Sequence, residues 1–107
     1  MKIHVLKSWI PYFEQVANGE KLFEIRKNDR GYAVGDALVL RRYNPLLSEY
    51  RSGWLAVIVT SMVSAEDCPW PFLQPGVVVM GIRETSYVER VNVLRKLKEQ
   101  QPDWNRP

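Results

Sequence analysis

The residue types best suited to chemistry gather in residues 19–26, which read GEKLFEIR. Lys21, Glu24 and Arg26 place two cations and one carboxylate within six positions, between apolar residues. The apolar residues indicate a strand packed on a core, where a charge is costly unless it lines a solvated or ligand-binding surface. The three charged residues therefore predict a site that binds a ligand or acts on one.

Three interpretations of this cluster remain open on residue type and spacing. As a binding site, Lys21 and Arg26 would engage phosphate, and Glu24 would accept a hydrogen bond from an exocyclic amino group such as cytosine N4. As a metal-independent hydrolase, Lys21 would activate water or stabilise an oxyanion while Glu24 transfers the proton. A structural ion pair between Glu24 and Arg26 on a solvated strand face is the alternative that spacing alone favours, and it is worth only about 0–1 kcal/mol.

The elements around the cluster are a strand over residues 3–6, a helix from Pro11 and a second strand over residues 22–27. Gly19 can adopt the left-handed conformation that ends a helix, so we expect Lys21 to lie in the turn before the second strand. Alternation along that strand then puts Phe23 and Ile25 into the core, and Glu24 and Arg26 on the opposite face. The early helix would form one wall of a cleft.

Downstream, the pattern predicts strands over residues 37–43, 54–63 and 77–83, with a loop over residues 44–53. Ser86 and Glu89 form a capping-box pattern that opens a last helix, which ends near residue 101. The apolar stripe of that helix is expected to consist of Tyr87, Val91, Leu94 and Leu97. The predicted class is mainly β with flanking helices (α+β), a small pseudo-β-barrel of about five to six mostly antiparallel strands. Residues 1–85 would be the barrel domain, and residues 86–107 a helical extension packed on it.

Aromatic residues near the cluster extend the candidate site. Trp9 and Tyr12, at the start of the first helix, are expected at the rim of the cleft, where a base could stack on them at about 1–3 kcal/mol per base. Trp70 or Phe72 could act in the same way. The complete set of ligand-binding candidates is Lys21, Glu24, Arg26, Trp9, Tyr12 and Arg30, with Lys21 and Glu24 as the catalytic candidates. A concave site of this kind suits unpaired RNA better than a duplex.

The composition of the chain limits the kinds of ligand, metal and partner that we expect. The net charge of +3 is compatible with an anionic partner such as RNA or a nucleotide. One histidine, His4, and one cysteine, Cys68, cannot assemble a usual zinc site, so we expect neither a metal nor a cofactor.

The N-terminal segment lacks a signal-peptide pattern and no apolar run is long enough to span a bilayer, so we expect a cytoplasmic protein that does not contact membranes. The proline-rich loop over residues 68–76 would either contact a protein partner or fold onto the barrel end.

The motif resembles the signature of the ASCH domains, a branch of the PUA-like superfamily of small β-barrels. That signature is G-x-K-x-x-E-x-R, which Gly19, Lys21, Glu24 and Arg26 match. With the run that begins at Val34-Gly35-Asp36, the longer pattern resembles a small bacterial and phage family of ASCH-related proteins of unknown function. The match is specific over residues 4–43 and weaker over residues 54–84.

The resemblance implies a pseudo-barrel with a cleft between the motif strand and the first helix, and an RNA-binding or RNA-processing role. Some ASCH proteins are amidohydrolases that remove the acetyl group from N4-acetylcytidine, and others have been described as ribonucleases. In the amidohydrolases the motif lysine, which corresponds to Lys21, is catalytic and works with a threonine and a glutamate from a later loop. This chain has Glu24 at the position of the threonine, and Glu66 or Asp67 could supply the later carboxylate.

Overall fold

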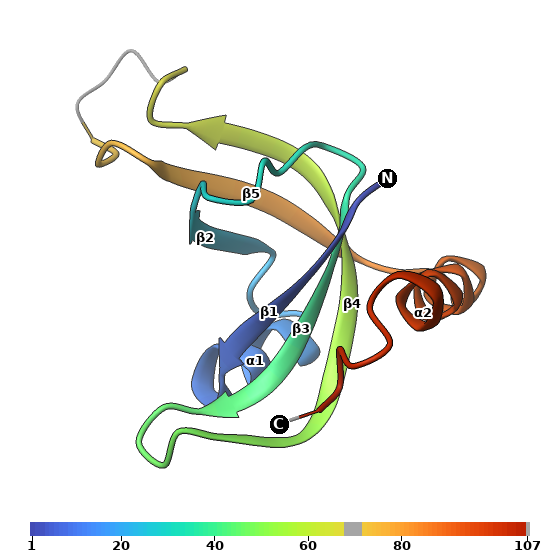
Figure 1. Ribbon diagram of the computed structural model, residues 1–107. Helices are drawn as coiled ribbons and strands as arrows, with labels where there is room; N and C mark the ends of the chain where they lie inside the picture. Colours follow the sequence, from blue (N-terminus) through green and yellow to red (C-terminus); the bar gives the residue numbers. More distant parts are fainter. Residues whose placement is uncertain (68–71, 107) are drawn as a thin grey trace.

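The computed structural model describes residues 1–67 and 72–106, which form one curled β-sheet and two helices (Figure 1). Along the chain the elements are β1 (Ile3–Trp9), α1 (Ile10–Ala17), β2 (Phe23–Lys27), β3 (Ala37–Asn44), β4 (Glu49–Ser64), β5 (Val77–Glu84) and α2 (Tyr87–Gln100). The predicted class, mainly β with two helices, is confirmed, as is the order of the elements. The sheet curls into half a barrel.

The strand order in the sheet is β1-β3-β4-β5-β2. β1 pairs with β3 in parallel, whereas the three other pairs of neighbours are antiparallel. A parallel pair needs a crossover connection, and the segment containing α1 and β2 supplies it. β1 and β2 are therefore the two edges of the sheet. Arg26 of β2 reaches across to β1, where its Nη1 donates a hydrogen bond to the carbonyl oxygen of Lys7 at 3.0 Å.

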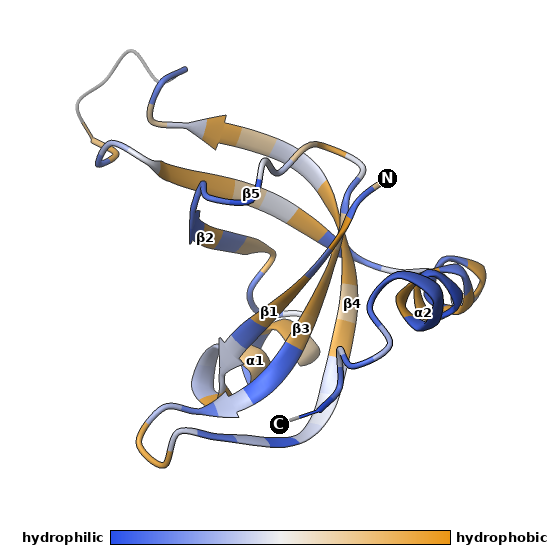
Figure 2. Ribbon diagram, viewed as in Figure 1, coloured by the Kyte–Doolittle hydropathy of each residue, from blue (hydrophilic) through white to orange (hydrophobic). Residues whose placement is uncertain are grey.

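The buried apolar residues form two clusters, one on each face of the sheet. Figure 2 shows hydrophobic residues along the central strands that contribute to both clusters. Inside the curl, Leu40 of β3 belongs to the same buried cluster as Phe13 of α1. On the outer face, Val39 clusters with Val93 and Leu97 of α2. α1 and α2 thus pack on opposite faces of the sheet, and only α1 borders the concave side.

The connection between β3 and β4 is shorter than the sequence predicted. Instead of a loop over residues 44–53, β3 continues to Asn44 and β4 already begins at Glu49. The side-chain oxygen of Asn44 accepts hydrogen bonds from the backbone N–H groups of Leu46 and Leu47, at 3.0 and 3.2 Å. This local turn reverses the chain immediately, so residues that look loop-like in sequence can pair as a hairpin.

The capping box at the start of α2 is present as predicted. Ser86 Oγ accepts a hydrogen bond from the backbone N–H of Glu89, and the Glu89 carboxylate accepts one from the backbone N–H of Ser86. No helix within the described residues combines the length and apolar character needed to cross a bilayer.

The predicted apolar stripe of α2 is partly wrong. Of its four residues, Leu97 is fully buried, Val91 and Leu94 are half-buried, and Tyr87 is 82% exposed. Val93 is fully buried instead. A helical pattern with apolar residues on several sides does not fix which side is covered. Here the apolar outer face of the sheet selects the side that contains Val93 and Leu97.

Candidate functional site

A tight turn after α1 brings Lys21 to the start of β2. Gly19 has a φ of 75°, the left-handed conformation predicted for it, and its N–H donates to the carbonyl oxygen of Val16 at 3.1 Å. The backbone N–H of Lys21 bonds in turn to the carbonyl oxygen of Gln15, at 3.1 Å. Lys21 therefore lies outside the strand, as expected, so the alternation of side chains along β2 does not fix the direction of its side chain.

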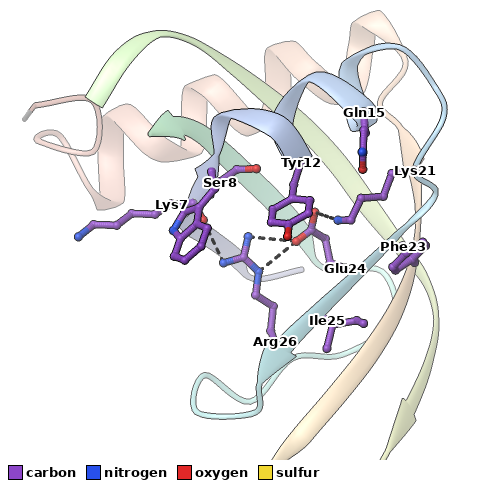
Figure 3. Close-up of a pocket in the computed structure, with 10 residues that line it drawn as sticks. Lys7, Ser8, Tyr12, Gln15, Lys21, Phe23, Glu24, Ile25 and Arg26 are labelled. Carbon is purple, nitrogen blue, oxygen red and sulfur yellow. Dashed lines mark hydrogen bonds and ion pairs between the residues drawn. The ribbon is translucent and has the colours of Figure 1, made fainter. Parts of the chain in front are cut away.

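The three charged residues of the motif converge (Figure 3). Lys21 Nζ lies 2.8 Å from Glu24 Oε1. On the other side, Arg26 Nε and Nη2 lie 3.1 and 3.0 Å from Glu24 Oε2. Only 5% of the Glu24 side chain is exposed, against 12% for Lys21 and 22% for Arg26. A buried carboxylate thus holds two cations that keep some access to solvent, and the cluster has one net positive charge.

The predicted faces of β2 must be corrected for its apolar residues. Phe23 and Ile25 were expected to fill the barrel, yet they are 43% and 57% exposed, whereas Glu24 is 3% exposed. Glu24 pairs directly with Met80 of β5, which belongs to the inner core, so Glu24 faces the inside of the curl. Its two cationic partners compensate the burial of its charge, which a pattern based on hydropathy does not anticipate.

A pocket of about 450 Å³ lies over this cluster, between α1, the end of β1 and β2. Its lining residues are Lys7, Ser8, Trp9, Tyr12, Gln15, Lys21, Phe23, Glu24, Ile25 and Arg26 (Figure 3). The volume is in the range of small-molecule and cofactor sites. The cleft expected between the motif strand and the first helix is therefore present, and we call it the motif pocket.

Trp9 and Tyr12 form the aromatic part of the rim, as predicted. Their ring centroids lie 6.5 Å apart with an interplanar angle of 25°, and about half of each side chain is exposed. Sequence reasoning missed Lys7, Ser8 and Gln15, which also line the pocket, as do Phe23 and Ile25. A signal was available for Gln15, because it lies one helical turn after Tyr12 and so shares its face of α1.

Arg30 is the one ligand-binding candidate that does not line the motif pocket. It lines an adjacent hollow of about 430 Å³ together with Lys7, Arg26 and Lys27. Tyr32 lies in the wall of this second hollow. Burial raises the pKa of the Tyr32 phenol, while the positive charges of Arg30 and Arg26 act in the opposite direction.

His4 belongs to a separate buried pair. Its Nε2 lies 2.9 Å from Asp36 Oδ2, and its ring is 4.7 Å from that of Tyr32. Asp36 also accepts hydrogen bonds from the backbone N–H groups of Lys2 and Ala33, both at 3.0 Å. Burial acts to raise the pKa of Asp36, but these hydrogen bonds outweigh it and hold the pKa below the ordinary value. His4 is thus buried and hydrogen-bonded, and it does not line the motif pocket.

The carboxylates considered as later catalytic partners lie elsewhere. Asp67 accepts a hydrogen bond from Ser64 Oγ at 2.9 Å, and Glu66 accepts one from the backbone N–H of Gly76 at 3.4 Å. Neither lines the motif pocket. In the described part of the chain, no three His, Cys, Asp or Glu side chains gather where they could hold a metal ion.

Part of the loop over residues 68–76 lies outside the described residues, including Cys68 and Trp70. Phe72 is 79% exposed and is not among the residues that line the motif pocket.

Comparison with known proteins gives a family without an assigned activity. The model of the family described as "Domain of unknown function (DUF3850)" matches residues 3–82, from β1 into β5. A curated relative from Escherichia phage P2, "Uncharacterized 12.9 kDa protein in GpA 3'region", is 45% identical over 42 residues. This segment is 39% of the present chain and 38% of the phage protein, so the match spans about two fifths of that relative's length.

Proposed function

This chain belongs to the DUF3850 family, and we propose that it binds RNA or a nucleoside-like ligand in the motif pocket. The observation that carries the proposal is the buried Glu24 carboxylate, which holds Lys21 and Arg26 at the floor of a pocket rimmed by two aromatic rings. An ion pair that only stabilised the fold would not need a hollow above it. We further infer that the half-barrel is of the PUA-like type and that its pocket corresponds to the ASCH cleft.

The hydrogen-bond inventory of the cluster favours an anionic ligand group. Lys21 has three N–H donors and Arg26 has five. Glu24 accepts from one donor of Lys21 and two of Arg26, and the carbonyl oxygen of Lys7 accepts from one more. The remaining donors of both cations can bind a phosphate or carboxylate, and the Glu24 contacts fix where they do so.

The walls of the pocket suit a flat, partly apolar group. Trp9 and Tyr12 offer ring faces at the rim, and Phe23 and Ile25 add apolar surface from β2. Glu24 Oε1 accepts only one hydrogen bond within the described residues, so it can still accept one from an exocyclic amino group. A base stacked at the rim, with its phosphate on the cations, would use all of these features.

Binding of single-stranded RNA to Lys21→Ala and Arg26→Ala tests the proposal. We expect each variant to fold and to lose about tenfold in affinity, because a charge-assisted hydrogen bond contributes roughly 1.5–3 kcal/mol. Fluorescence anisotropy of a labelled oligonucleotide measures the affinity, and circular dichroism checks the fold. Lys98→Ala on α2 is the matched control, since it removes one exposed cation from the opposite face of the sheet. Affinities equal to that of the parent chain in both pocket variants would refute the site.

A hydrolase is the second candidate, favoured by the 2.8 Å contact between Lys21 Nζ and Glu24 Oε1. In this scheme water adds to the acyl carbon of an N4-acylated cytidine, the C–N bond breaks, and cytidine and a carboxylic acid are released. Lys21 would stabilise the oxyanion, and Glu24 would pass the proton of water to the leaving nitrogen. Incubation with N4-acetylcytidine, followed by chromatography, tests this, and release of cytidine that Lys21→Ala abolishes would establish it. Incubation with labelled RNA tests the ribonuclease alternative.

A protein partner that contacts residues 68–76 stays a prediction. If neither RNA nor nucleosides bind, recovery of one defined partner by the parent chain, but not by Phe72→Ala, would favour this role.

A further inference from the structure

The motif pocket is not isolated on the surface, because the second hollow adjoins it. Lys7 and Arg26 line both spaces, so the two hollows are neighbours that share these side chains. The two hollows have similar volumes, about 450 and 430 Å³. A ligand that occupied both hollows would therefore pass over Lys7 and Arg26.

The two hollows differ in chemistry. Four cations line the second hollow, Lys7, Arg26, Lys27 and Arg30, and they face a single carboxylate, Asp29. The aromatic rings there, Tyr32 and Tyr50, both carry hydroxyl groups, whereas the motif pocket has Trp9 and Phe23 beside Tyr12. The second hollow therefore suits a charged group with little apolar surface.

Two of these cations make no ion pair within the described residues. Lys27 and Arg30 are exposed, and neither makes an ion pair or side-chain hydrogen bond with any residue in the described ranges 1–67 and 72–106. By contrast, Lys21 and Arg26 are held by Glu24, and Arg42 is held by Glu14 at 2.8 Å. Exposed cations without partners, beside a cation that anchors a ligand, are placed to neutralise further negative charge.

We propose that the ligand is a single-stranded RNA rather than a free nucleoside, and that the second hollow binds the phosphodiester next to the nucleotide in the motif pocket. This inference rests on the proposed function. Arg26 belongs to both parts of this site, because it contacts Glu24 in the motif pocket and also lines the second hollow. Phosphates along a strand would meet Lys27 and Arg30 in turn, while the base contacts stay in the motif pocket.

The affinities of a nucleoside, a nucleoside monophosphate and a short RNA test this inference. The probes are cytidine, cytidine monophosphate and a single-stranded cytidine-rich RNA of about six nucleotides. We expect the double variant Lys27→Ala/Arg30→Ala to lose about tenfold in affinity for the RNA and to bind cytidine like the parent chain. The slope of log affinity against log salt should become shallower by about 1.4, because two phosphate contacts are lost at about 0.7 each.

Arg95→Ala/Lys98→Ala is the matched control, since it also removes one exposed lysine and one exposed arginine, from α2 on the opposite face of the sheet. Equal losses in both double variants would mean that net charge alone matters, and would overturn the inference. If cytidine and RNA bind equally well and Lys27→Ala/Arg30→Ala changes neither, the motif pocket stands and the second subsite is refuted. If no probe binds, the proposed function itself fails.

Discussion

Two buried carboxylates in this small domain are held in opposite ways. Glu24 and Asp36 are almost equally buried, at 3% and 4% exposure. Asp36 is bound by His4 and by two backbone N–H groups, so the groups that hold this carboxylate are used within the fold. Glu24 is bound by two long cationic side chains whose remaining donors face a pocket.

The comparison separates a structural polar cluster from a functional one. A buried carboxylate that collects backbone N–H groups and a histidine ring completes a local structure, and the pKa of Asp36 is lowered because these contacts outweigh the opposite effect of burial. A buried carboxylate that collects cations instead positions charge for something outside the protein. Burial and hydrogen-bond satisfaction are alike in both, so only the identity of the partners distinguishes them.

The largest expected effect is on stability, from Asp36→Ala. The substitution leaves the backbone N–H groups of Lys2 and Ala33 and the ring of His4 without their acceptor, which should lower the free energy of unfolding by about 3 kcal/mol. Urea denaturation followed by circular dichroism measures the loss. RNA affinity, measured where the variant is still folded, should stay within about twofold of the parent value.

Asp36→Asn is the companion variant if Asp36→Ala does not fold. The amide keeps an oxygen acceptor but places an N–H₂ donor against other donors, so a smaller loss of stability is expected. A tenfold loss of RNA affinity in folded Asp36→Asn would contradict the structural assignment of this pair.

The same pair predicts an acid-dependent loss of stability. The pKa of Asp36 is lower in the folded chain than its ordinary value of 3.8, so its stabilising contribution is present above that value. As the pH falls through the folded-state pKa, the carboxylate takes up a proton and the contribution is lost. Urea denaturation between about pH 6 and about pH 3 should therefore show a steeper decline for the parent chain than for Asp36→Asn. Parallel pH profiles of stability for the parent chain and Asp36→Asn would contradict this prediction.

At Glu24 we expect the reverse of the Asp36 result, a large effect on RNA affinity and a small effect on stability. Glu24→Gln removes the charge that positions Lys21 and Arg26, so RNA affinity should fall about tenfold. The free energy of unfolding should change by only about 1 kcal/mol, because the released cations can reach solvent. Anisotropy titration and urea denaturation of the same preparation give both values. A large loss of stability with unchanged affinity would make Glu24 a structural residue like Asp36.

How much of this was predictable depends on whether the cause is local. Gly19 and the capping box at Ser86 act within a few residues, so the turn that delivers Lys21 and the start of α2 follow from sequence. The hairpin after Asn44 is also local, but its side-chain turn was mistaken for the start of a long loop.

Features set by tertiary pairing were harder to predict. The rule that apolar residues face inward put Phe23 and Ile25 in the core. The structure buries Glu24 instead, because partners on both sides compensate its charge. The separation of Arg30 from the motif pocket depends on how β2 and the following turn lie beside β1, which no short-range pattern encodes.

The smallest expected effect concerns the aromatic rim. Trp9→Ala and Tyr12→Ala remove rings that are half exposed, so neither should lower the free energy of unfolding by more than about 1 kcal/mol. Each should weaken RNA binding about fivefold, because a stacked base contributes roughly 1–3 kcal/mol and an exposed rim gives the lower end of that range. Unlike the loss in Lys27→Ala/Arg30→Ala, this loss should be the same for cytidine and for RNA and should not depend on salt, because no charge is removed. Exposed Tyr87→Ala on α2 is the matched control. Rim variants that bind like this control would remove base stacking from the proposal and leave the cations as its only support.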